Sequence, residues 1–285
     1  MQHLKIFIKL TRLDKPIGYM LLFWPCSWGL AYAYSFNNNV NLLIYYLTLF
    51  FLGSVLMRSA GCIFNDIIDK NIDKKVARTK DRPIASGKIS INRSFFYVML
   101  LCFMAFIVLL QFNFLTILLG MGSMTLAFSY PFMKRITYWP QLFLGLTFNW
   151  GILMAWTSMG LSISMEIILL YLAAIFWTLG YDTIYGTQDM SDDEIIGIKS
   201  TSIKFKKNIK LFVAISYFFS ISTLLYLFKD LLGQNINSLL LVFFSMSLLF
   251  QVYKFNKSDP GSCLSLFKFN NISGLILFLG ILSIN

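Results

Sequence analysis

This sequence of 285 residues contains few charged residues, a single histidine and no closely spaced cysteines. Only 13% of the residues are charged, whereas 57% are hydrophobic. A chain with so little charge cannot hide that much apolar surface in one soluble core, so the composition excludes a water-soluble globular protein and predicts an integral membrane protein. The four cysteines lie far apart and show no metal-binding or redox spacing, and a single histidine, His3, stands before the first apolar run.

Apolar runs long enough to cross a membrane recur along the whole chain. A helix that crosses a hydrocarbon layer of about 30 Å needs roughly 20 apolar residues. Backbone polar groups in lipid must be satisfied within the segment, so these runs predict helices. We therefore expect an all-α integral membrane protein, with one polytopic membrane domain over residues 1–285. Its nine predicted transmembrane helices are residues 17–35, 41–64, 94–111, 113–131, 140–159, 163–185, 209–228, 236–253 and 264–284.

Basic residues mark one side of this predicted bundle. With nine spans, 22 of the 24 Lys and Arg residues lie on the same side, and the exceptions are Arg58, inside the second span, and Lys229. The positive-inside rule makes that side cytoplasmic and places the N-terminus there. Topology and anionic membrane lipid then account for the net charge of +11, and nucleic acid is not expected as a partner.

The N-terminal segment has basic residues, an apolar run and an Ala-Tyr-Ala sequence, as a secretory signal does. Its apolar run is longer than that of a usual signal, so it predicts an uncleaved first span. About 16 residues precede this span, which is short for a mitochondrial transit peptide. We therefore expect a multi-pass protein of the bacterial cell inner membrane.

Acidic residues concentrate in two segments that follow the second and the sixth predicted spans. Nine of the 13 Asp and Glu residues lie in residues 65–83 and 181–201. These segments belong to the long cytoplasmic connections at about 65–93 and 182–208, so function is expected on the cytoplasmic face. If the second span continues as a helix, Asn65, Asp66, Asp69 and Asp73 fall within about 100° of one another.

Like charges four residues apart destabilise a free helix, and both segments contain such a pair: Asp69 with Asp73, and Asp189 with Asp193. A single pair of this kind is usually a solvated helix end. Two of them at one membrane face favour a bound counter-ion instead. The oxygen donors, without nearby His or Cys, favour Mg²⁺, and neither segment has the glycine-centred spacing of an EF-hand calcium loop.

Basic residues beside the first acidic segment supply partners for phosphate oxygens. A diphosphate between two metal-loaded acidic faces is thus the expected ligand, and its other end would lie in lipid or in the bundle, which suggests a polyprenyl chain. The nearby basic residues are Lys74, Lys75, Arg78, Lys80 and Arg82.

Several motifs together resemble the UbiA-type membrane aromatic prenyltransferases. They are NDxxDxxxD and RTxxRPxxSG within residues 65–87, YDTxYxxxDxxDDxxxGIKST over residues 181–201, and the stretches RLDKPIG (12–18), RSAGCIFND (58–66) and YPFMKRITYWP (130–140). Within this family the chain is most similar to the branch that transfers a polyprenyl group to 4-hydroxybenzoate in ubiquinone biosynthesis. The resemblance covers residues 12 to about 204.

The resemblance implies a nine-helix bundle around a central cavity that opens sideways to lipid and is capped by the two acidic motifs. It implies an Mg²⁺-dependent aromatic polyprenyltransferase whose substrates are a polyprenyl diphosphate and 4-hydroxybenzoate. The implied ligands of Mg²⁺ are Asn65, Asp69, Asp73, Asp189 and Asp193, with Asp182 either a further ligand or a proton acceptor. The implied diphosphate contacts are Arg78, Arg82 and Lys134, and the candidate catalytic residues are Asp66, Asp182 and Tyr185.

Arg58 has two interpretations, because a cation inside a span is costly and usually faces the bundle interior or a cavity. It either extends to the interface or receives the carboxylate of the aromatic acid, and the second is preferred since Arg58 lies seven residues before Asn65. Tyr185 either orients substrate or anchors a helix at the interface. Two other functions stay open: prenylation of another acceptor, such as a dihydroxynaphthoate or haem, and transport of a cation or a polyprenyl phosphate.

Overall fold

The computed structural model describes residues 2–284, which contain helices and no strand. The longer helices are α1 (Gln2–Thr11), α2 (Ile17–Asn37), α3 (Val40–Ile68), α5 (Ile91–Leu109), α6 (Phe114–Ile136), α7 (Pro140–Asn149), α8 (Gly151–Ser158), α9 (Met165–Gly186), α12 (Ile209–Leu227), α13 (Ile236–Lys254) and α14 (Pro260–Leu282). The short ones are α4 (Lys70–Asp73), η1 (Thr187–Asp189), α10 (Met190–Ile196), α11 (Thr201–Lys204) and η2 (Lys229–Leu231). The predicted all-α fold is confirmed.

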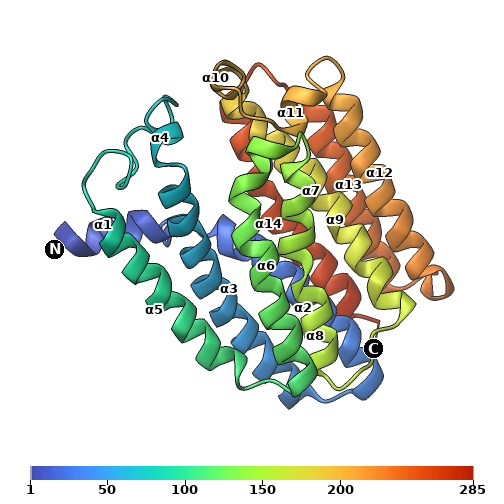
Figure 1. Ribbon diagram of the computed structural model, residues 1–285. Coiled ribbons are helices and arrows are strands. Elements are labelled where there is room, and N and C mark those ends of the chain that lie inside the picture. Colours follow the sequence, from blue (N-terminus) through green and yellow to red (C-terminus); the bar gives the residue numbers. More distant parts are fainter. Residues whose placement is uncertain (1, 285) are drawn as a thin grey trace.

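The long helices run side by side, and α1 lies crosswise next to α3 (Figure 1). The short helices α4, α10 and α11 gather at one end of the bundle. Both acidic segments lie at this end, which we call the motif side. The two segments are more than 100 residues apart in the sequence, and the fold brings them to the same end.

The predicted count of nine spans is not confirmed. Helices cover all nine predicted segments, but seven are long and apolar enough to cross a membrane. One of the remaining two is α2, which is rich in Trp and Tyr and contains Pro25. The other is the pair α7 and α8, where the helix is interrupted at Trp150. There the Asn149 amide donates to the Gly145 carbonyl at 2.7 Å and competes with the helical ladder.

Side chains of the type expected at helix starts fix where several helices begin. Asn39, Ser90 and Asn113 each accept a hydrogen bond from a backbone N–H in the first turn of α3, α5 and α6. Asp259 does the same for α14, and Pro260 follows it at the first helical position. These caps set the connections between helices at defined residues.

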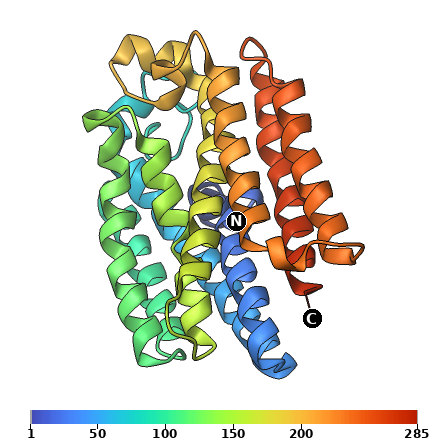
Figure 2. The same cartoon turned by 90° about the vertical axis from the view of Figure 1, so that its right-hand side faces the viewer.

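α9 is the central helix of the bundle. In the apolar window of residues Met165–Ile196, which begin with α9, 72% of the residues are buried, against 22% in α5 and 17% in α6. The helices α12, α13 and α14 pack together on one side of α9 (Figure 2). Trp28 of α2 contacts Trp177 of α9 with ring centroids 4.8 Å apart, and Trp177 donates to Asn270 of α14. The second acidic motif therefore begins in the most deeply buried helix.

Candidate active site

A cavity of about 420 Å³ lies inside the bundle, with walls from α2, α3, α5, α6, α7, α8 and α9. Along α3 its lining runs from Leu49 to Asp66, a length of about 25 Å at 1.5 Å per residue. Apolar side chains such as Phe50, Leu109 and Phe112 line the deep end. Charged and polar side chains line the motif side, so the cavity suits a long apolar molecule with a polar head.

Exposed residues of α5 and α6 contribute to the cavity wall. Phe106 of α5 and Met121 of α6 line the cavity and are 40% and 50% exposed. Gly61 of α3 also lines the cavity and is exposed. The sideways opening to lipid that the resemblance implies stays a prediction.

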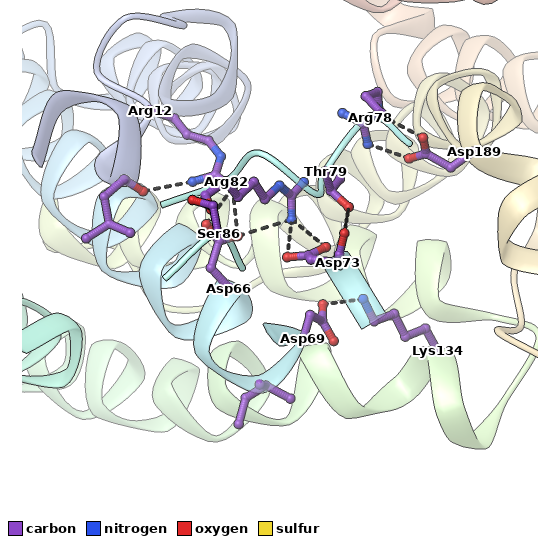
Figure 3. Close-up of polar contacts among 12 residues, drawn as sticks. Arg12, Asp66, Asp69, Asp73, Arg78, Thr79, Arg82, Ser86, Lys134 and Asp189 are labelled. Atoms are coloured by element: carbon purple, nitrogen blue, oxygen red, sulfur yellow. Dashed lines mark hydrogen bonds and ion pairs between the residues drawn. The ribbon is translucent and has the colours of Figure 1, made fainter. Parts of the chain in front are cut away.

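The carboxylates of the first acidic motif are buried and each is paired with a cation (Figure 3). Asp69 binds Lys134 and Arg135 of α6, and Asp73 binds Arg82 at 2.9 Å. The predicted continuous helix breaks at Asp69, between α3 and α4, although the Asp69 N–H still donates to Asn65 O at 2.9 Å. The break lets successive carboxylates point to different partners.

Asp66 has both carboxylate oxygens engaged. Arg12 Nη2 donates to them at 2.7 and 2.9 Å, and Arg82 Nη1 lies 3.1 Å from one of them. Arg12 adopts a left-handed conformation with φ 58°, which is unfavourable for a residue with a side chain. The ion pair with Asp66 holds this conformation and places the Arg12 guanidinium in the cavity lining.

The loop after α4 is bound to the second acidic motif. Arg78 Nε donates to Asp189 at 2.7 Å, its Nη1 donates to the Tyr185 hydroxyl at 3.1 Å, and its guanidinium lies 5.5 Å from the centroid of the Tyr185 ring. The backbone N–H of Ala77 donates to Asp192 at 3.1 Å. These contacts join the two motifs over the motif side of the bundle.

The protonation of these charged groups follows from burial and from their partners. Burial raises the pKa of the Asp69 carboxyl above its ordinary value, while Lys134 acts in the opposite direction without cancelling the shift. Burial lowers the pKa of the Arg78 guanidinium, but the hydrogen bonds with Asp189 and Tyr185 outweigh this and the pKa is raised overall. Arg78 therefore stays charged, whereas Asp69 depends on its cations to remain ionised.

Deeper in the cavity are polar groups without protein partners. Arg58 and Asp182 line it, and neither takes part in an ion pair among residues 2–284. Within the same range, Arg58 Nε and the hydroxyl of Tyr181 are buried and have no hydrogen-bond partner. Since buried polar groups are normally satisfied, this part of the cavity is built for a polar ligand.

Some predicted site residues line the cavity, and others contact the lining residues through ion pairs. Seven of them line the cavity: Arg58, Asn65, Asp66, Arg78, Arg82, Asp182 and Tyr185. Others join the lining through ion pairs, Asp73 through Arg82 and Asp189 through Arg78. Lys134 reaches the first motif by its pair with Asp69, and Asp193 lies on α10, outside the lining.

Further polar residues of the lining that were not among the predicted site residues include Arg12, Tyr130 and Tyr181. Arg12 and Tyr130 begin two of the stretches that carry the resemblance, and Tyr181 begins the second acidic motif. Their position in these motifs was the available signal. The side of the helix on which each lies was not readable from the sequence.

A divalent metal fits the chemistry of the donors but not their present arrangement. The acidic side chains and Asn65 provide oxygen atoms alone, which suits a hard cation. Among residues 2–284, however, no three His, Cys, Asp or Glu side chains converge as metal ligands do. Each buried carboxylate of the first motif is neutralised by Arg or Lys, so metal binding requires these pairs to be exchanged.

The fold and the site define a helical membrane protein whose apolar cavity ends in paired arginines and aspartates at the motif side. The chain belongs to the UbiA prenyltransferase family, whose model matches residues 22–272. It is 43% identical over 284 residues to a bovine protein named 4-hydroxybenzoate polyprenyltransferase, mitochondrial, covering 98% of this chain and 75% of that protein.

Solved structures share the fold at lower identity. The apo structure of a UbiA homolog from Aeropyrum pernix has a TM-score of 0.77 and 21% identity, covering 93% of this chain and 97% of the other. A UbiA homolog from Archaeoglobus fulgidus bound to GPP and Mg²⁺ has a TM-score of 0.74 and 16% identity, covering 98% and 99%.

The prediction of a bacterial inner membrane is wrong by this comparison. The relatives from cattle, human and Arabidopsis thaliana are mitochondrial proteins. The prediction depended on the length of chain before the first span. That length carries no information on the compartment, because the chain covers 75% of the bovine protein. The multi-pass membrane character stands, with seven helices apolar and long enough to span.

Proposed function

We propose that this protein transfers a polyprenyl group from a polyprenyl diphosphate to 4-hydroxybenzoate, at the ring carbon ortho to the hydroxyl, and releases diphosphate, in ubiquinone biosynthesis. The observation that carries the proposal is the 43% identity to 4-hydroxybenzoate polyprenyltransferase over 98% of the chain. The cavity supports it, because an apolar channel with cations at one end accommodates a prenyl chain and a diphosphate.

The diphosphate lies at the motif side, where Arg78 and Arg82 line the cavity and Lys134 stands beside Asp69. Guanidinium groups bind phosphate oxygens in the same forked geometry that they use for carboxylates. Arg78 and Arg82 therefore exchange their Asp partners for the substrate. Asp66 keeps Arg12 and Arg82 in position through its ion pairs, which is the role that we assign to it.

Mg²⁺ is the cofactor that we propose, held by Asn65, Asp69 and Asp73 on one side and by Asp189 and Asp193 on the other. When bound, it would neutralise negative charge on the leaving diphosphate. The UbiA homolog from Archaeoglobus fulgidus, which was solved with GPP and Mg²⁺, supports a divalent metal in this fold. The metal would free the cations that now neutralise Asp69, Asp73 and Asp189.

The aromatic acid lies below the diphosphate. Arg58 is seven residues, or about two helical turns, before Asn65 on α3, so it is reached by a ligand inside the cavity. Its guanidinium receives the carboxylate of 4-hydroxybenzoate. Tyr185 orients the substrate, because its ring lines the same cavity and its hydroxyl is held by Arg78.

Every bond change of the reaction can be assigned. The bond between the first prenyl carbon and the diphosphate oxygen breaks, and its electrons stay on the diphosphate. The ring carbon ortho to the hydroxyl bonds to the prenyl carbon, and the ring proton passes to Asp182, which restores aromaticity. Asp182 suits this task because it lines the cavity and has no ion pair among residues 2–284. The apolar walls keep water from the allylic cation.

Membranes that contain the protein test this function with radiolabelled 4-hydroxybenzoate, prenyl diphosphates of several lengths, and Mg²⁺ with or without a chelator. We expect a labelled lipid product that requires the metal. Asp189→Asn should lower the rate by about 100-fold, as loss of a charge contact at a reacting site does. The control is Asp230→Asn in η2, away from the motif side. Product formation that ignores the chelator would contradict the metal assignment, and absence of product would contradict the function.

A further inference from the structure

Arg58 is held in the cavity wall by two neutral neighbours. Its guanidinium carbon lies 5.2 Å from the centroid of the Phe148 ring on α7. On α2 it faces Gly18, which also lines the cavity. Among residues 2–284 no acidic side chain pairs with Arg58, and its Nε has no hydrogen-bond partner. Asp182 attracts Arg58 from beyond ion-pair distance, so the direct contacts that limit the position of Arg58 are those with Phe148 and Gly18.

Gly18 leaves the space that Arg58 occupies. A Cβ atom at residue 18 would lie 2.9 Å from Arg58 Nε, 3.6 Å from Nη2 and 3.7 Å from Cγ. Real Cβ contacts are essentially never as short as the first of these, so any other residue at position 18 moves the arginine. Because the obstructed atoms belong to a flexible side chain, the cost of such a change is displacement of Arg58 rather than disruption of the backbone.

We propose that Gly18 is a positioning residue that fixes Arg58 for the carboxylate of the acceptor and thereby makes the enzyme prefer an aromatic acid to a neutral phenol. This inference rests on the proposed function of Arg58. A guanidinium binds a carboxylate best when two N–H groups point at its two oxygens, which demands a fixed orientation. Phe148 limits the guanidinium on the α7 side.

Gly18→Ala is the informative variant, and Gly61→Ala is its matched control. Both glycines line the cavity, but a Cβ at Gly61 meets no atom within 4 Å. For Gly18→Ala we expect the KM for 4-hydroxybenzoate to rise about tenfold and the KM for prenyl diphosphate to stay within about twofold, the pattern for loss of one binding contact. Its preference for 4-hydroxybenzoate over 4-hydroxybenzaldehyde should fall with the KM change. Gly61→Ala should keep the wild-type preference.

Arg58→Ala separates this inference from the proposed function. If Arg58→Ala loses the preference for the acid and Gly18→Ala keeps it, the positioning role of Gly18 is overturned and the role of Arg58 stands. If Arg58→Ala also keeps the preference, the carboxylate assignment is overturned together with the inference. Equal losses in Gly18→Ala and Gly61→Ala would likewise refute the inference. Apparent melting temperatures near that of the wild type show that the comparison concerns folded protein.

Discussion

Arg78 shows how much one side chain connects in this protein. It lies in the loop after α4, yet its hydrogen bonds go to Asp189 and Tyr185 of the second motif. Its side chain is 39% exposed, so the ion pair alone contributes little to stability. The value of the contact is geometric, because it brings a cation of one motif to the carboxylate of the other at the motif side of the cavity.

Replacing Arg78 with Lys keeps the positive charge and removes the forked arrangement of guanidinium N–H groups. A lysine cannot make two parallel hydrogen bonds to a carboxylate or a phosphate. We expect Arg78→Lys to raise the KM for prenyl diphosphate about tenfold, since hydrogen bonds to charged groups contribute about 1.5–3 kcal/mol. The KM for 4-hydroxybenzoate should not change. Lys80→Ala, an exposed cation in the same loop, is the control, and steady-state kinetics with each substrate varied provides the measurement. An equal effect at Lys80 would show that only net charge matters.

At the scale of the element, α9, η1 and α10 act as one support for the second motif. Asp182 and Tyr185 are three residues apart on one face of α9, and Asp189 follows in η1, where Arg78 donates to both Asp189 and Tyr185. α10 then ends at Gly197, which has φ 81°. This residue in the left-handed conformation ends α10 and turns the chain toward α11.

Gly197→Ala should weaken this helix end. A side chain in the left-handed region costs about 1–2 kcal/mol, and because nothing lies within 4 Å of a Cβ at this position, strain is the only penalty. We expect a lower apparent melting temperature in detergent. Gly122→Ala in α6 is the opposite case, since that glycine is helical, has ordinary φ and also has free space. It should raise the melting temperature or leave it unchanged. A stable Gly197→Ala variant would show that α10 does not depend on this cap.

For the whole molecule, the sequence predicted the class and the motifs better than their geometry. Hydropathy alone predicted a helical membrane protein, and the even spacing of the motifs after spans two and six predicted their meeting at one end. The pairing of Asp66 with Arg12 was not predictable, because it joins residues 54 positions apart through a left-handed turn. Nor was the role of Gly18 recognisable, since its effect depends on Arg58, which lies on a different helix.

The number of membrane spans, between seven and nine, is a property of the whole molecule. It can be determined from the side of the membrane on which the connections between helices lie. If α2 crosses the membrane, Asp14 before it and Asn37 after it lie on opposite sides. If α7 and α8 together cross, Tyr138 before α7 and Ser162 after α8 also lie on opposite sides. All four residues are exposed.

Single cysteines at these four positions, in a background without the native cysteines, therefore give a direct reading with a membrane-impermeant thiol reagent on oriented vesicles. We expect Asp14→Cys and Tyr138→Cys to react from one side, and Asn37→Cys and Ser162→Cys to react from the other, because helices on each of the nine segments run the length of the bundle (Figure 1). Reaction of Asp14→Cys from the same side as Asn37→Cys would mean that α2 does not cross.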